Sequence, residues 1–278
     1  MFDAALPTKL QRSHGRAAVR LRSDAGEGAA AGARLEGLAQ SGCGKAFLPR
    51  VHGRAPEIVF LNTAGGLTGG DTLVYRLELG AGGVATGTTQ TAERAYASSG
   101  GSAGVTVALE AGEGARLDWL PQETILFDGS ALERETEIRM AGNARVLLCE
   151  TIVLGRTAMG ERVGRLAFRD TRRVIRDGRL DWLEPLRLDD ATLAAPGLAA
   201  PGAARAMATV ALFAPGAEDA LAALRALPEP AGVRMGSSAW NGRCILRLLA
   251  CEAPPLRRAL AAALGVLRGG PLPRVWQI

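Results

Sequence analysis

The chain has 278 residues, of which 47% are hydrophobic and 36 are glycine, and its formal net charge is +5. This composition excludes a disordered chain and is typical of a globular protein with many turns and a substantial core. The positive charge comes mostly from arginines spread along the sequence, which argues against nucleic-acid binding. With no secretory leader, no run of 18 apolar residues and no CxxC pair among four cysteines, we expect a cytoplasmic protein without a membrane partner.

The first two thirds of the chain predict a body of β-strands. Residues 1–15 carry no regular pattern and are expected to be loosely ordered, whereas residues 16–190 contain short alternating segments separated by turns. Within residues 73–79, for example, every second side chain is apolar. Ala-Gly pairs ending at Gly82, Gly112 and Gly142 recur at regular intervals, which predicts stacked units of two strands each.

The C-terminal third has a different pattern. Leucines at helical spacing predict helices over residues 217–227 and 254–268, and a strong turn signal at Asn241-Gly242 predicts a hairpin between them. We therefore expect one domain spanning residues 1–278. It would be mainly β, with stacked, β-helix-like layers of many short strands over 16–190, and with strands and about two α-helices over 205–270 packed on that body.

A glycine-rich stretch at residues 61–71 (LNTAGGLTGGD) is the most unusual feature of the sequence. Its GxxxxG spacing suggests a phosphate loop, but Asp71 and Thr72 follow where such a loop has Lys and Ser or Thr. The flanking segments both predict strands, so no helix N-terminus would receive an anion. We expect the glycines to allow a tight strand crossing or close contact with a partner.

Candidate chemical groups are mostly carboxylates. The two histidines, His14 and His52, fall in segments predicted to be loops, and no GxSxG motif is present, so a nucleophilic triad is not supported. Carboxylates at strand ends or within apolar runs are Asp71, Glu93, Glu123, Asp128, Glu150 and Glu161. Two explanations remain open: ion pairs with nearby arginines such as Arg94, Arg134, Arg156 and Arg162, or a cavity whose oxygen ligands bind a divalent ion weakly.

Four further motifs accompany the glycine-rich stretch. They are residues 89–96 (TQTAERAY), 117–129 (LDWLPQETILFDG), 154–161 (LGRTAMGE) and 272–276 (LPRVW). In this order, over about residues 41–278, they closely resemble the urease accessory protein UreD family, called UreH in some organisms.

The resemblance implies a non-enzymatic, cytoplasmic factor required for the maturation of urease. Its partners would be apo-urease, UreF and, through UreF, the GTPase UreG. The assembly would deliver nickel to the urease active site, where a carbamylated lysine bridges two nickel ions. The resemblance also implies a mostly β fold with two helices, no tightly bound cofactor, and an internal polar tunnel for transient Ni²⁺.

Candidate residues follow from the positions that match these motifs. The resemblance implies a transient nickel path through Asp71, Glu123, Asp128 and Glu161, and it implies no catalytic residue. Structural or partner-contact roles are expected for Gly65, Gly66, Gly69, Gly70 and Gln122. Two alternatives are a protein-binding adaptor without metal transfer, and a hydrolytic enzyme that uses Glu123 and Asp128 as an acid–base pair.

Overall fold

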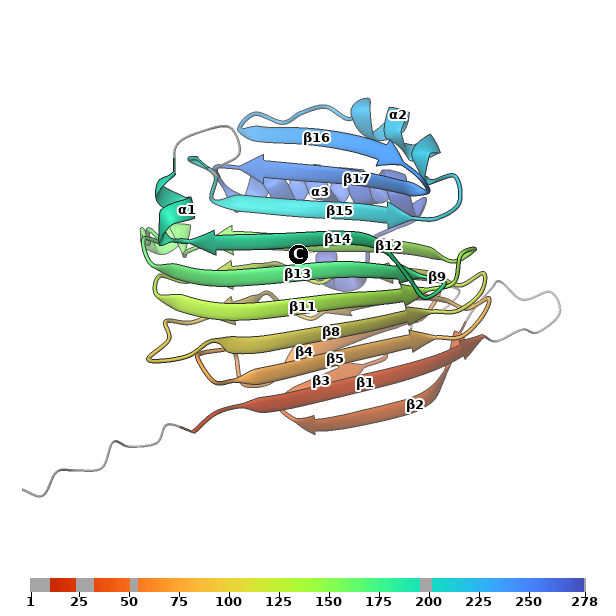
Figure 1. The fold of residues 1–278 in the computed structure, drawn as a ribbon, viewed down its shortest axis with the longest axis horizontal. Coiled ribbons are helices and arrows are strands. Elements are labelled where there is room, and N and C mark those ends of the chain that lie inside the picture. The colour runs from red at the N-terminus through yellow and green to blue at the C-terminus, as the bar shows by residue number, and fades with distance from the viewer. Residues whose placement is uncertain (1–10, 24–32, 51–54, 196–201, 278) are drawn as a thin grey trace, which may run out of the picture.

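The computed structural model describes residues 11–23, 33–50, 55–195 and 202–277, and two β-sheets stacked face to face form most of it (Figure 1). The first sheet has seven strands in the order β14-β13-β11-β8-β5-β1-β2. Its strands are β1 (His14–Ser23), β2 (Ala33–Gly42), β5 (Thr72–Leu79), β8 (Ala103–Ala111), β11 (Ser130–Met140), β13 (Leu166–Arg176) and β14 (Arg179–Asp189).

The second sheet has ten strands, in the main order β16-β17-β15-β12-β9-β6-β4-β3, with β10 joining β12 to β7. They are β3 (Gly44–Phe47), β4 (Glu57–Asn62), β6 (Val84–Thr89), β7 (Glu93–Ala95), β9 (Arg116–Trp119), β10 (Thr124–Leu126), β12 (Arg145–Leu154), β15 (Ala206–Phe213), β16 (Val233–Trp240) and β17 (Arg243–Ala250).

The chain passes from one sheet to the other in successive coils. Strand β5 leads into β6, β8 into β9, and β11 into β12, and each strand is parallel to its equivalent in the next coil. Gly82, Gly112 and Gly142 lie in the turns within these pairs. A Cβ at Gly112 would lie 2.8 Å from the backbone nitrogen of Ala81, so glycine lets adjacent turns stack closely. The predicted repeat is therefore one coil, and the stacked-layer fold is confirmed.

The main core lies between the two sheets. Along β5, Leu73, Tyr75 and Leu77 point inward and are buried, as the alternating pattern predicts. The Tyr75 ring of the first sheet packs on the Phe60 ring of the second sheet. On the second sheet, the ring centroids of Phe60 and Trp119 lie 5.6 Å apart. These aromatic side chains bury large apolar areas and set the spacing of the sheets at this level.

Two helices cover the outer side of the second sheet near the C-terminus. Helix α3 (Ala253–Arg268) starts with prolines in its first turn and ends at Gly269, which has φ of +64°, so the helix predicted at 254–268 is confirmed. The helix predicted at 217–227 is shorter: a 3₁₀ turn, η2 (Ala217–Asp219), precedes α2 (Ala220–Arg225). The predicted hairpin is β16–β17, with positive φ at Asn241 and Gly242.

Short helical segments lie elsewhere in the chain. Helix α1 (Asp190–Ala194), which the sequence pattern did not predict, starts where the Asp189 carboxylate accepts a hydrogen bond from the Thr192 amide. The 3₁₀ turns η1 (Thr157–Met159) and η3 (Arg274–Trp276) are each three residues long. In the described part of the chain, no helix combines the length and the apolar character that crossing a bilayer demands.

The N-terminal strands form an antiparallel hairpin, β1–β2. The prediction that His14 lies in a loose segment is wrong, because β1 pairs in parallel with β5 from the His14–Thr72 position onward. The His14 Nδ1 atom lies 2.8 Å from the Thr72 hydroxyl. Residues 1–10, most of the segment predicted to be loosely ordered, and His52 lie outside the described residues.

Candidate functional site

The recognised motifs gather at one end of the coiled body. Strands β1, β5, β8, β11 and β13 of the first sheet are parallel and start at this end, on the left in Figure 1, so the loops that enter the last four lie side by side. These loops are residues 63–71, 96–102, 127–129 and 155–165. At the opposite end, β5–β6, β8–β9, β11–β12 and β13–β14 are each connected by two to four residues. Four motifs that are far apart in the sequence therefore share one face.

The glycine-rich loop is held against the segment around Tyr96. Gly66 has φ of +153°, and a Cβ there would overlap the Tyr96 ring and lie 2.8 Å from the Arg94 carbonyl oxygen. A Cβ at Gly69 would overlap Ser98 and the carbonyl oxygen of Gly100. The close approach expected of these glycines is therefore made within the chain, to the neighbouring coil.

We expect Gly66→Ala to destabilise the protein more than Gly65→Ala. Gly65 also has positive φ (+77°), but a Cβ there meets nothing within 4 Å, so alanine should cost about 1 kcal/mol of backbone strain. At Gly66 the overlap adds to the strain, and the total should exceed about 2 kcal/mol. Urea unfolding of the two variants measures the difference. Equal losses would show that the Tyr96 loop moves aside at little cost.

Asp71 and the last glycine of the loop have local roles. The buried Asp71 carboxylate accepts hydrogen bonds from the Ser13 amide at 2.7 Å and the Thr68 amide at 2.8 Å. Gly70 has φ of +91° and lies beside the Arg12 side chain. Asp71 thus fixes the end of the glycine-rich loop to the start of β1, and both of its oxygens are used for this.

Asp128 and Glu161 lie together at the loop end. Asp128 accepts hydrogen bonds from the Gly164 and Arg165 amides at 2.8 and 2.9 Å, which lower the pKa of its carboxyl group. The Glu161 carboxylate accepts hydrogen bonds from the side chain and the backbone amide of Arg156 and from the backbone amide of Asp128. The hydrogen bond from the Arg156 side chain is the main cause of its lowered pKa. Both groups stay ionised near neutral pH.

Glu123 and Gln122 lie apart from that pair, beside the C-terminal helix. Arg257 on α3 donates to Gln122 Oε1 at 2.9 Å and to Glu123 Oε2 at 3.1 Å. Its guanidinium also packs over the Trp276 ring at 4.9 Å, and Gln122 donates to the Val275 carbonyl. Gln122 is therefore a structural contact within the chain, which joins the LPQE segment to the C-terminus.

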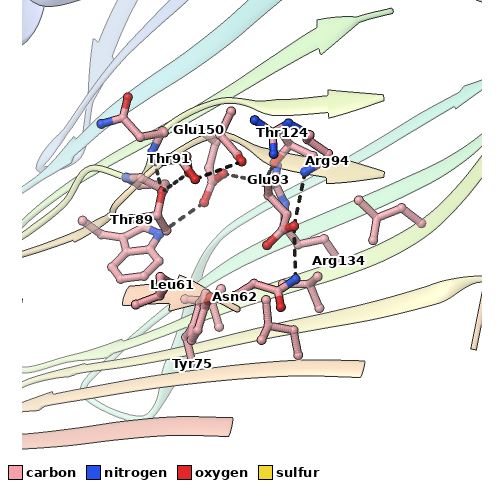
Figure 2. Close-up of a pocket in the computed structure, with 18 of the residues that line it drawn as sticks. Leu61, Asn62, Tyr75, Thr89, Thr91, Glu93, Arg94, Thr124, Arg134 and Glu150 are labelled. Carbon is pink, nitrogen blue, oxygen red and sulfur yellow. Dashed lines mark hydrogen bonds and ion pairs between the residues drawn. The ribbon is translucent and has the colours of Figure 1, made fainter. Parts of the chain in front are cut away.

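An internal cavity of about 70 Å³ lies between the sheets, next to the loop end (Figure 2). Its lining combines the apolar core with polar side chains. The polar lining includes Asn62, Tyr75, Thr89, Thr91, Glu93, Arg94, Gln122, Thr124, Arg134 and Glu150. Of the motif residues predicted for the nickel path or for partner contact, Gly65 and Gln122 line this cavity. Asp71, Glu123, Asp128 and Glu161 are not among the residues that line it.

Glu93 is a cavity residue whose carboxyl group has a pKa near neutral pH. Burial raises the pKa of its carboxyl group to about 7, although the Asn62 side-chain amide, 3.3 Å away, opposes this (Figure 2). Burial also raises the pKa of the neighbouring Tyr75 hydroxyl. Glu93 thus exists as a mixture of charged and neutral forms near pH 7, beside a phenol that stays protonated.

A buried ion-pair network forms the far wall of the cavity. Arg134 Nη1 lies 2.7 Å from Glu150 Oε2 and 3.1 Å from the Thr124 hydroxyl (Figure 2). The other guanidinium nitrogens of Arg134 donate to Asp170. Burial raises the pKa of the Glu150 carboxyl group, whereas Arg134 and Arg172 overcome the burial of Asp170 and lower the pKa of its carboxyl group. The network therefore holds fixed charges inside the protein.

The network continues to a second hollow on the other side of Glu150. Arg172 links Asp170 to Glu184 at 2.8 Å, and Glu184 in turn pairs with the half-exposed Arg247. The second hollow, of about 320 Å³, is lined by Glu150 and Glu184 among other residues. Glu150 therefore lines both hollows. Charged side chains in contact with one another extend from the first cavity to the second hollow.

The sequence motifs located the loop end but not the inner polar groups. Glu93 and Glu150 stood among the carboxylates considered, and the ion-pair explanation fits Glu150 with Arg134 and Glu161 with Arg156. Glu150 carried a usable signal, because it interrupts an apolar run. The sequence around Asn62 and Asp170 gave no such signal. Within the described ranges, no group of three or more His, Cys, Asp or Glu side chains is arranged to hold a metal ion.

Fold and site together define a class: a coiled, mainly β protein with a buried ion-pair network in its interior and the sequence motifs gathered at one end. The family model "UreD urease accessory protein" matches residues 13–277, and the chain belongs to this family. Relatives that carry this name are similar to the chain over nearly their whole length. A "Urease accessory protein UreD" of Dinoroseobacter shibae is 58% identical over 99% of this chain and 95% of its own.

More distant relatives carry the same name. The protein of Jannaschia sp. is 51% identical over all of both chains, and that of Chelativorans sp. is 42% identical over 99% of this chain and 98% of its own. The sequence resemblance to the UreD family is thereby confirmed.

Proposed function

We propose that this protein is a maturation factor for urease, which binds apo-urease and, with UreF and the GTPase UreG, delivers nickel to the urease active site. Its membership of the UreD family over residues 13–277 carries this proposal. The protein would act without catalytic residues of its own, as a scaffold and conduit in the cytoplasm. Four cysteines free of disulfides are consistent with a reducing compartment.

The internal cavity supports a conduit for the cargo ion. Ni²⁺ in transit needs ligands that exchange, and carboxylate, hydroxyl and amide oxygens bind divalent ions more weakly than thiolate or imidazole cages. Glu93 and Asn62 offer such oxygens near the loop end, and Glu150 offers them between the two hollows. We therefore place the proposed path along Glu93 and Glu150, with Asp128 and Glu161 as charged groups at the loop end.

The two alternatives gain less support. In the enzyme alternative, Glu123 and Asp128 would need opposed protonation states, but amide hydrogen bonds lower the pKa of Asp128, and Glu123 is paired with Arg257. An adaptor would bind the same partners as in our proposal but would not pass nickel through its interior. Replacing Glu93, a cavity group, separates these two better than replacing Asp71, whose carboxylate holds a loop together.

Co-expression tests the partner proposal directly. We expect tagged protein, co-expressed with its cognate UreF and the urease structural subunits, to co-elute with both in size exclusion, and urease activity to need all of them together with UreG and nickel. A matched expression without the tagged chain should yield inactive apo-urease. A soluble, folded chain that captures neither partner would contradict the proposal.

A further inference from the structure

The ion-pair network between the two hollows is balanced in charge. Each of its carboxylates is in contact with at least one arginine, and the positive and negative side chains are equal in number. The members are Arg134, Arg172 and Arg247 on one side and Glu150, Asp170 and Glu184 on the other. A divalent ion that moves from the internal cavity to the second hollow therefore meets carboxylates that are already paired.

Glu150 and Asp170 are paired very unequally. Glu150, which lines both hollows, is held by Arg134 Nη1 at 2.7 Å and by the Trp119 indole N–H at 3.3 Å. Asp170 accepts hydrogen bonds from Nε and Nη2 of Arg134 at 3.0 and 2.7 Å. It also contacts Nε and Nη2 of Arg172 at 2.8 and 2.7 Å. Glu150 is thus the carboxylate that can be released most easily.

The contacts of Arg134 allow it to lose Glu150 and remain in the network. A guanidinium presents its donors in a rigid, planar fork, so the two nitrogens on Asp170 hold the whole group in place. Nη1 also lies 3.1 Å from the Thr124 hydroxyl, which remains as a hydrogen-bond partner. Arg134 would therefore keep its charge paired and its donors satisfied, which avoids the cost of an isolated buried cation.

We infer that Arg134 is a tethered cation that competes with the divalent cargo ion for Glu150. This inference rests on the proposed function, which supplies the cargo and the path. Without an ion, Arg134 occupies the Glu150 carboxylate and closes the path between the hollows. An arriving divalent ion takes the Glu150 oxygens, while Asp170 retains the guanidinium. When Arg134 Nη1 pairs with Glu150 again, the ion is released.

This competition determines which class of cation can pass. A monovalent ion carries the same charge as the guanidinium, so it gains no Coulomb energy by replacing Arg134 at the buried Glu150 carboxylate. A divalent ion carries twice that charge and prefers oxygen ligands. Arg134 thus acts as a specificity-determining residue, which favours divalent over monovalent ions without binding the cargo itself.

The test is Ni²⁺ binding to the isolated full-length protein, measured by isothermal titration calorimetry at pH 8. In Arg134→Met, an ion at Glu150 replaces at most a proton, whereas in the wild type it must replace a fixed guanidinium. We expect Arg134→Met to bind Ni²⁺ at least about tenfold more tightly than the wild type. The gain should disappear when Glu150→Gln is added. Arg139→Met, an exposed change on the same strand, is the matched control and should bind as the wild type does.

Unchanged or weaker Ni²⁺ binding by Arg134→Met would overturn the inference. A gain that persists in the double variant would do the same, because the ion would then bind away from Glu150. An arginine with a purely structural role would lower stability on removal and leave Ni²⁺ binding no tighter.

Arg134→Lys decides the matter if Arg134→Met does not fold. Lysine keeps the positive charge, but its single nitrogen cannot reproduce two contacts to Asp170 and a third to Glu150. We expect this variant to bind Ni²⁺ at least about threefold more tightly than the wild type, because Glu150 is held less firmly. Wild-type or weaker affinity would overturn the inference.

A failure of the proposed function would look different. In that case co-expressed urease would become active without this chain, whatever Ni²⁺ affinity the isolated protein has. The inference about Arg134 fails separately, when urease activation requires the wild-type chain and Arg134→Met binds Ni²⁺ no more tightly than the wild type.

Discussion

Arg134→Met should lower the free energy of unfolding by about 4 kcal/mol, because it leaves the buried Glu150 without its cation and Asp170 with one arginine in place of two. Arg134 is 6% exposed and pairs with Glu150 and Asp170, which are 2% and 0% exposed. Methionine keeps the unbranched apolar part of the arginine side chain, so the loss of stability measures mainly the removal of the guanidinium charge. Arg172 remains to contact Asp170, whereas Glu150 keeps a hydrogen bond of 3.3 Å from the Trp119 indole N–H.

Arg139→Met is the matched control for this experiment. Arg139 lies on the same strand, β11, but its side chain faces outward, is 57% exposed and pairs with Glu137. An exposed pair contributes about 0–1 kcal/mol, so the control should unfold nearly as the wild type does. Urea unfolding followed by circular dichroism measures both. Similar losses in the two variants would show that the inner network is not structurally important.

Much of the fold could be predicted because local patterns and tertiary structure agree. The alternating segment at 73–79 has one buried face, and the repeated Ala-Gly turns mark positions where coils stack. Asn241-Gly242 adopts the positive φ angles that such a turn requires. Helix α1 could not be foreseen, because five residues give too short a pattern, and its start depends on the Asp189 side chain.

The sequence marked single residues of the candidate site but did not show which side chains they contact. The motifs indicated the loop end because they carry glycines and carboxylates at strand ends. That Glu123 pairs with Arg257, 134 positions later, follows from the packing of α3 on the second sheet, which no local pattern encodes. The inner network joins β11, β12 and β13 for the same reason: stacking of coils sets which charges meet, and the sequence shows each charge alone.

The second large effect concerns Glu93 and pH. The Glu93 carboxyl group binds its proton more tightly in the folded chain, with a pKa of about 7, than at its ordinary pKa of 4.5. Its contribution therefore favours folding fully below pH 4.5 and is lost as the pH rises from about 4.5 to about 7. Since the side chain is only partly buried, we expect the lost stability to be about 2 kcal/mol.

Glu93→Gln should remove this dependence. Glutamine keeps an oxygen that can accept the Asn62 hydrogen bond and carries no charge, so the variant should match the wild type near pH 4.5 and exceed its stability by about 2 kcal/mol at pH 8. Glu78→Gln is the control, since ion pairing with Arg20 and Arg76 lowers the pKa of that carboxyl group. Urea unfolding from pH 4.5 to 8 distinguishes them, and parallel curves for Glu93→Gln and wild type would contradict the assignment.

The same variant tests the proposed nickel path. A charged Glu93 attracts a divalent ion into the cavity, and a neutral one does not, so a group that titrates near neutrality can both accept the ion and release it. We expect Glu93→Gln to be more stable at pH 8, to capture apo-urease and UreF normally, and yet to activate urease at least about tenfold more slowly. Normal activation by this stabilised protein would place the nickel path elsewhere and favour an adaptor, because a scaffold gains from stability and has no use for the charge.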